Sequence, residues 1–141
     1  MRVLFGLLAL ALVGCGQRQA LAPAAVPPPK AVEFKQGQGL RVTTEAAQLI
    51  GLEKRAVESV GGALVIPLTA ILQTSEGAFA YVINGTRLLR MPIRLGELKG
   101  ATTVVTDGLF EGDIVAVAGV KYLWFAELQS LKGGVGCADG H

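Results

Sequence analysis

Residues 78–95 carry the strongest secondary-structure pattern in the chain and read AFAYVINGTRLLRMPIRL. The first six of them are mostly aromatic, β-branched or small, and Asn84-Gly85, a dipeptide typical of a tight hairpin turn, follows directly. The returning segment puts Met91, Ile93 and Leu95 on one face and Arg90, Pro92 and Arg94 on the other, as a strand with one buried face does. We therefore expect a β-hairpin, with its second strand at a sheet edge because Pro92 cannot donate a ladder hydrogen bond.

Short strand patterns continue on both sides of this hairpin. They are expected at Leu40–Val42, at Glu53–Val60 with Ala56 and Val57 inside, at Leu64–Ile66, at Thr102–Thr106 and at Ile114–Ala118. Short strands at this spacing predict an all-β fold, a small antiparallel barrel or sandwich of about six or seven strands.

One or two short helices should accompany the strands. Thr43 or Thr44 can cap a helix that runs to Ile50, and Glu45 is favourable near its positive end. Near the end of the chain, Trp124, Leu128 and Leu131 have helical spacing.

The first residues have the pattern of an export signal. Arg2 precedes the apolar run Val3–Val13, which suits a signal-peptide core but is too short to span a bilayer as a helix. The run ends in Leu-Val-Gly before Cys15, which resembles the lipobox of bacterial lipoproteins. The resemblance implies that residues 1–14 are a signal peptide and that Cys15 becomes lipidated.

A proline- and alanine-rich segment separates this cysteine from the folded part. We assign residues 15–39 to the lipidated cysteine and a disordered tether, because such sequences stay extended and solvated. The folded domain is expected at residues 40–131, followed by a flexible Gly-rich tail at 132–141. The formal net charge is +2, with scattered Lys and Arg, so no nucleic-acid partner is expected.

Five segments of the folded part resemble, in order, motifs of one protein family. Val42–Leu52 resembles the segment with which periplasmic adaptor proteins enter their membrane-proximal domain, and Leu64–Leu72 resembles their V-P-x-S-A-V-L segment. Met91–Gly96 is similar to x-P-V-x-L-G, and Gly108–Val115 to G-L-x-x-G-D-x-V-V. Gly119–Leu128 resembles the closing segment of the heavy-metal efflux branch. These adaptors are the membrane fusion proteins of tripartite pumps built on resistance-nodulation-division (RND) transporters.

The resemblance implies a lipid-anchored periplasmic subunit or accessory of an RND efflux system, partnered by the transporter, a full-length adaptor, or both. It covers the membrane-proximal domain only. Complete adaptors insert a barrel domain, a lipoyl-like domain and a helical hairpin after the entering segment, whereas Val57–Gly62 simply bridges that position here. The outward side of the hairpin, with Arg87, Arg90 and Arg94, is the expected contact surface.

Catalysis is not expected, because general acid–base chemistry at neutral pH most often uses His and the only His is His141. A periplasmic metal-binding lipoprotein is an alternative function, since Cys137, Asp139 and His141 offer sulfur, oxygen and nitrogen donors suited to Cu(I) or Zn(II). A disordered tail with an incidental thiol is the alternative at that site. A truncated adaptor remnant is the third interpretation of the chain.

Overall fold

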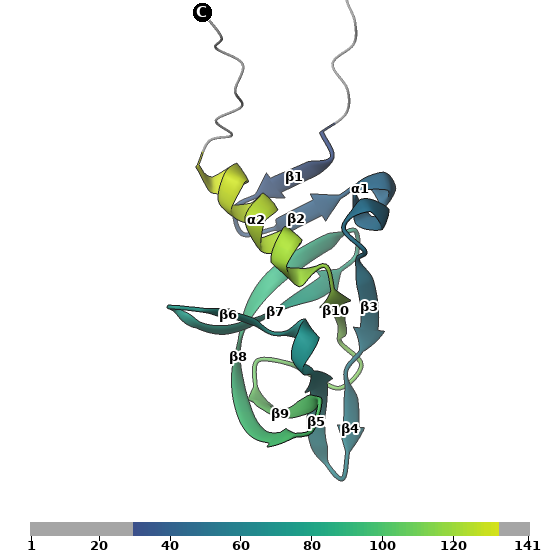
Figure 1. Ribbon diagram of the computed structural model, residues 1–141, viewed down its shortest axis with the longest axis vertical. Coiled ribbons are helices and arrows are strands. Elements are labelled where there is room, and N and C mark those ends of the chain that lie inside the picture. The colour runs from purple at the N-terminus through teal and green to yellow at the C-terminus, as the bar shows by residue number, and fades with distance from the viewer. Residues whose placement is uncertain (1–29, 133–141) are drawn as a thin grey trace, which may run out of the picture.

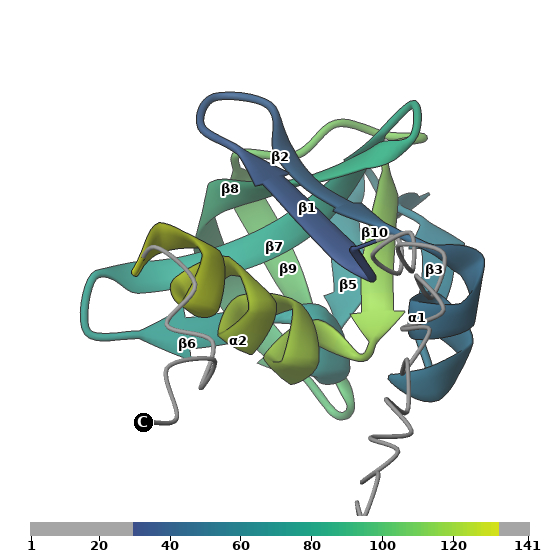
Figure 2. The same cartoon turned by 90° about the horizontal axis from the view of Figure 1, so that it is seen from above.

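The computed structural model describes residues 30–132, which Figures 1 and 2 show from two directions. This part of the chain is mainly β, which confirms the all-β prediction. Its elements in chain order are β1 (Val32–Lys35), β2 (Gly39–Val42), α1 (Thr44–Leu49), β3 (Glu53–Ala56), β4 (Glu58–Val60), β5 (Ala63–Pro67), the 3₁₀ turn η1 (Leu68–Ala70), β6 (Leu72–Thr74), β7 (Gly77–Asn84), β8 (Arg87–Lys99), β9 (Thr102–Asp107), β10 (Ile114–Ala118) and α2 (Val120–Leu131).

The strands form an antiparallel sheet that closes on itself. The order along the sheet is β3-β10-β7-β8-β9-β5-β4, so β3 and β4 are the two ends of the path. These two strands are halves of one extended segment, separated only by Val57. The first half pairs with β10 and the second with β5, and the segment thereby completes the ring. The result is a small barrel to which β1–β2 and β6 add further strands.

Backbone hydrogen bonds fix the point where that segment passes from one side of the ring to the other. The Val57 N–H donates to the carbonyl of Asp113 at 2.7 Å, and the Gly112 N–H donates to the carbonyl of Val57 at 3.0 Å. The Asp113 carboxylate in turn accepts from the backbone N–H of Phe110 at 2.8 Å. The turn before β10 is therefore a scaffold feature.

The β7–β8 hairpin is confirmed, although its turn is shifted by one residue. Asn84 pairs with Arg87, so the two central residues are Gly85 and Thr86. Gly85 has a φ of +61°, whereas Thr86 does not have a positive φ. This pattern of φ angles is that of a type II′ turn, which needs a positive φ, and therefore favours glycine, only at its first central position.

The prediction that β8 lies at an edge is wrong. β8 pairs with β7 on one side, and on the other side with β2 at Leu88 and with β9 from Arg94 onward. Pro92 lies between these last two contacts. Counting from the hairpin turn, the Pro92–Phe79 pair is one that exchanges no hydrogen bonds, so the proline nitrogen faces the gap between β2 and β9. The sheet accommodates proline there without losing a ladder bond.

Alternating side chains build two cores, one on each side of the sheet. The first lies inside the ring and takes buried residues from β5, β7, β8, β9 and β10 and from Val57 between β3 and β4, among them Val57, Ile66, Ala80, Ile93, Val105 and Val115. The second lies on the outer surface, where α2 and the β1–β2 hairpin cover the sheet, as Figure 2 shows, and it contains Leu40, Leu72, Tyr81, Leu88, Ala116, Val120 and Leu123. Both cores are made within residues 30–132.

Some boundaries differ from the prediction. β1 lies inside the range 15–39 given to the tether, because Val32 and Phe34 alternate with charged residues and pack into the outer core. β1, β6 and the division of Glu53–Val60 raise the strand count of the described part above seven. Ala56, expected inside, is exposed, and only Val57 of that pair is buried. The predicted helices are present, with the Thr43 side chain capping α1 by accepting from the Ala46 N–H at 3.2 Å.

Candidate functional site

The three arginines predicted as a contact surface have different environments. The side chains of Arg87 and Arg90 are only 18% and 20% exposed, whereas that of Arg94 is 82% exposed. Arg87 donates from Nη1 to the carbonyl of Gly39 at 3.3 Å. Arg94 Nε lies 3.7 Å from the Asp107 carboxylate, which is also exposed. Of the three, Arg94 is therefore the one that presents its charge to solvent.

Arg90 belongs to a buried polar cluster that joins α2 to the barrel. Its Nε donates to Oε1 of Glu127 at 3.0 Å, and the Tyr81 hydroxyl donates to Oε2 at 2.7 Å. Tyr81 is fully buried and Glu127 is 5% exposed. Each carboxylate oxygen of Glu127 thus has a donor from the barrel, Tyr81 from β7 and Arg90 from β8. A hydrogen bond to a carboxylate is stronger than one between neutral groups.

Two aromatic rings enclose the Arg90 guanidinium. Its central carbon lies 4.5 Å from the ring centre of Phe79 on β7 and 4.8 Å from that of Trp124 on α2. Both distances are within the range in which a cation is attracted to an aromatic face. The helix therefore contributes an acid and a ring to the cluster, and the sheet contributes the cation, a ring and the phenol.

Burial raises the pKa of the Tyr81 phenol far above its ordinary value, and the hydrogen bond to Glu127 and the negative charge of that residue act in the same direction. Arg90 opposes the shift. Tyr81 is consequently a permanent hydrogen-bond donor at physiological pH. Every buried side-chain nitrogen and oxygen within the described part of the chain has a partner. The cluster is therefore saturated, and its chemistry is that of a structural clamp.

Sequence reasoning did not identify this cluster. Tyr81 and Arg90 are cross-strand neighbours, which a correct hairpin register implies. Glu127 carried a further signal, because it is an acid on the same side of α2 as the buried Val120 and Leu123. An acid at such a position needs a buried partner.

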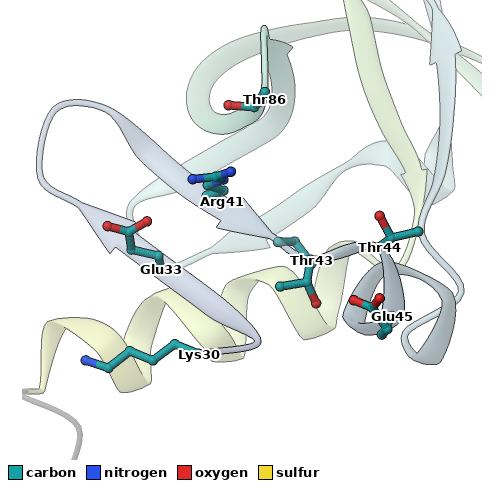
Figure 3. A pocket seen from close by; sticks show the side chains of 8 residues that line it. Lys30, Glu33, Arg41, Thr43, Thr44, Glu45 and Thr86 are labelled. Carbon is teal, nitrogen blue, oxygen red and sulfur yellow. The ribbon is translucent and has the colours of Figure 1, made fainter. Parts of the chain in front are cut away.

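A polar hollow of about 500 Å³ lies between the β1–β2 hairpin and the start of α1, as Figure 3 shows. Glu33 and Arg41 face each other across the two strands, and Lys30 and Glu45 also line the hollow. The hollow is thus lined by two cationic and two acidic side chains, and this balance favours neither an anionic nor a cationic ligand. This pattern is typical of a solvated surface.

The other predicted sites, Cys15 and the donors Cys137, Asp139 and His141, lie outside the described residues. Between residues 30 and 132, no group of three His, Cys, Asp or Glu side chains could hold a metal ion. Over the same range, no helix combines the length and the apolar character needed to cross a membrane.

Fold and cluster together define a small closed β-barrel domain with one longer helix clamped to its wall. No protein-family model matches the chain, and neither does any curated protein. Among solved structures, the chain is similar to the NMR structure of a 180-residue piece of SilB from Cupriavidus metallidurans CH34, which comprises the N-terminal metal-binding site and the membrane-proximal domain.

The likeness to the SilB piece has 24% sequence identity and a TM-score of 0.44, and it covers 52% of this chain and 44% of that one. The chain thus spans less than half the length of the SilB piece. The likeness is one of fold alone.

Proposed function

We propose that this chain is a lipid-anchored periplasmic subunit or accessory of an RND efflux system, with heavy metals as the substrate class of the pump. Its role is to bind, without catalysis, to the inner-membrane transporter, to a full-length adaptor, or to both. The lipid on Cys15 keeps the domain at the membrane and raises its local concentration near its partner.

The observation that carries the proposal is that the adaptor-like segments form one closed unit. The entering segment, Val42–Leu52, contains α1 and joins β2 to β3. These two flanking strands pair with β8 and β10, the strands that hold the later motifs. The Gly108–Val115 segment is joined to Val57 by two backbone hydrogen bonds, one from the Val57 N–H to the Asp113 carbonyl and one from the Gly112 N–H to the Val57 carbonyl. The segments that resemble the adaptor domain, and that occur in the same order, therefore also contact one another in the folded structure.

The bridge between these segments limits what the subunit can reach. Where complete adaptors insert further domains, β4 and β5 are joined by Gly61-Gly62 in a tight hairpin, and both glycines have positive φ. The adaptor hairpin that contacts the outer-membrane channel is absent from this position. We therefore place the action of this chain at the transporter and the membrane-proximal part of a complete adaptor.

The second half of β8 is the surface we assign to the partner. Arg94 is exposed there, and Leu95 and Leu98 are 39% and 63% exposed on the same strand. An exposed cation beside exposed leucines combines the two features that protein interfaces use, an apolar centre and a charged rim. Arg87 and Arg90, which are bound within the chain, do not belong to this surface.

Co-purification from native membranes, followed by identification of the bound proteins, tests the proposal. We expect an RND transporter or adaptor to be recovered with the wild-type chain and to be reduced severalfold by Leu98→Glu combined with Arg94→Glu. Arg55→Glu on β3, an exposed arginine on another part of the barrel, is the matched control. Fatty-acid labelling that is lost in Cys15→Ala tests the anchor separately. Recovery of neither partner with the lipidated wild type would contradict the proposal.

A further inference from the structure

The outer face of α2 carries an unusual set of exposed side chains. At helical spacing, Lys121, Tyr122, Phe125 and Gln129 fall on one side of α2, together with Lys132 directly after its last residue, and all five are exposed. Tyr122 is 57% exposed and Phe125 49%. The Lys121 Nζ lies 6.0 Å from the Phe125 ring centre, so the cation and the ring share this stripe. We call these five residues the α2 stripe.

The charge of the α2 stripe has one sign. Its two charged residues are Lys121 and Lys132, and the only acid of the helix, Glu127, is buried on the opposite side. The aromatic side chains lie between the two lysines in sequence. Aromatic rings flanked by lysine on one face of a helix are the composition of helices that lie in the interface of an anionic membrane.

An apolar hollow continues the stripe beside the first turn of the helix. It has a volume of about 390 Å³ and is lined by Ile71, Leu72, Val120, Lys121 and Tyr122, among others. The exposed apolar surface of this end of the barrel is thus larger than the two rings alone. Burial of such a surface is favourable in proportion to its area.

The position of the chain ends brings this surface to the membrane. Both ends of the described part, at residues 30 and 132, leave the barrel from the end where α2 lies (Figure 1). Cys15 is separated from Lys30 by so few residues that a fully extended chain would span at most roughly 50 Å. A lipid on that cysteine therefore holds the helical end of the barrel within reach of the bilayer.

We propose that the α2 stripe is a lipid-binding surface that rests on anionic phospholipid headgroups, with Tyr122 and Phe125 entering the interface and the lysines contacting phosphates. The proposal rests on the membrane tether of the proposed function and adds the orientation of the domain. The second half of β8, the proposed partner surface, lies toward the other end of the barrel from α2 (Figure 1), so the membrane and the partner would contact the domain at different ends.

Vesicle flotation tests this surface without the anchor and without the transporter. The protein is the chain from Gly16 to His141, which contains both cores, and the probes are vesicles of phosphatidylethanolamine with phosphatidylglycerol or of phosphatidylcholine alone. We expect binding to the anionic vesicles that weakens at high salt. Lys121→Gln should lower the partition coefficient about fivefold, and Phe125→Gln about tenfold.

Matched controls lie at other parts of the barrel. Phe110→Gln removes a ring that is 76% exposed, and Lys99→Gln removes a lysine whose side chain is 55% exposed. Both variants should bind as the wild type does. If the wild type does not float, or if Phe110→Gln and Phe125→Gln weaken binding equally, the lipid-binding surface is refuted, whereas the partner proposal is still decided by co-purification.

Two other occupants of the stripe would give distinct results. If a second copy covers it, sedimentation will show an oligomer that Phe125→Gln dissociates. If a protein partner covers it, Phe125→Gln will reduce the co-purified transporter and leave flotation unchanged. Either result overturns the lipid assignment.

Discussion

Glu127→Leu is the perturbation whose effect the structure specifies most closely. It leaves the Tyr81 hydroxyl without its acceptor in a fully buried position, which costs about 1–3 kcal/mol. It also removes the partner of Arg90. Because the Arg90 side chain is one-fifth exposed and stays between two rings with Glu76 3.9 Å away, we discount that loss to about 1 kcal/mol. The free energy of unfolding should fall by about 3 kcal/mol in total.

The companion variant Tyr81→Phe makes the test sharper. Alone it removes one hydrogen bond to a buried carboxylate and should cost about 2 kcal/mol. In the double variant, however, neither partner of that bond remains, and no hydroxyl is left unsatisfied. We therefore expect the double variant to be more stable than Glu127→Leu alone, by about 1 kcal/mol.

Urea unfolding followed by the fluorescence of Trp124, the only tryptophan in the chain, measures these differences. With a slope of about 1.5 kcal/mol/M, the midpoint for Glu127→Leu should fall by about 2 M while the slope stays unchanged. A cost below about 1 kcal/mol would mean that solvent satisfies the cluster. Simple additivity of the two single variants would show that Tyr81 and Glu127 are not coupled, and either result would refute the clamp.

Three further predictions follow from single features of the chain. Since the Tyr81 pKa is raised in the folded state, its contribution to the free energy of unfolding is present below the ordinary pKa near 10 and is lost as pH rises above that value. Unfolding measured at alkaline pH should show this loss of stability in the wild type and less of it in Tyr81→Phe. Gly108→Ala places a Cβ against the Pro92 carbonyl oxygen at a φ of +97° and should cost about 3 kcal/mol or more, whereas Gly100→Ala, at positive φ but in open space, should cost about 1 kcal/mol in the same unfolding assay. Removal of residues 133–141 should abolish any tight binding of Cu(I) or Zn(II) in a titration, and an unchanged affinity would exclude the tail as a metal site.

Local physical chemistry explains which elements the sequence predicts well. The β7–β8 hairpin follows from a run of β-forming residues before a glycine that supplies positive φ. The cap of α1 follows from Thr43, and the turn before β10 follows from Gly112 and Asp113, whose side chain accepts a nearby backbone N–H. In each case, the groups that form the structure are within about four residues of one another.

Predictions fail where a residue's environment is made by distant parts of the chain. Pro92 indicates an edge strand when it is considered alone, but β2 and β9 approach β8 on either side of it and leave the proline in the gap. Val32 and Phe34 resemble the end of a tether until β2 and α2 provide the surface on which they pack. Arg90 follows the pattern of an exposed strand position, yet it is covered by Trp124 from the last helix.

The sequence by itself determined that the folded part is mainly β with one or two short helices, where its main turns lie, and which family its motifs resemble, because these properties depend on neighbouring residues. Only the tertiary structure decided that one segment around Val57 closes the ring, that Glu127 joins Tyr81 and Arg90, and that α2 turns a lysine- and aromatic-bearing stripe outward. Each of these depends on contacts between residues far apart in the chain, and such contacts exist only after both cores have formed.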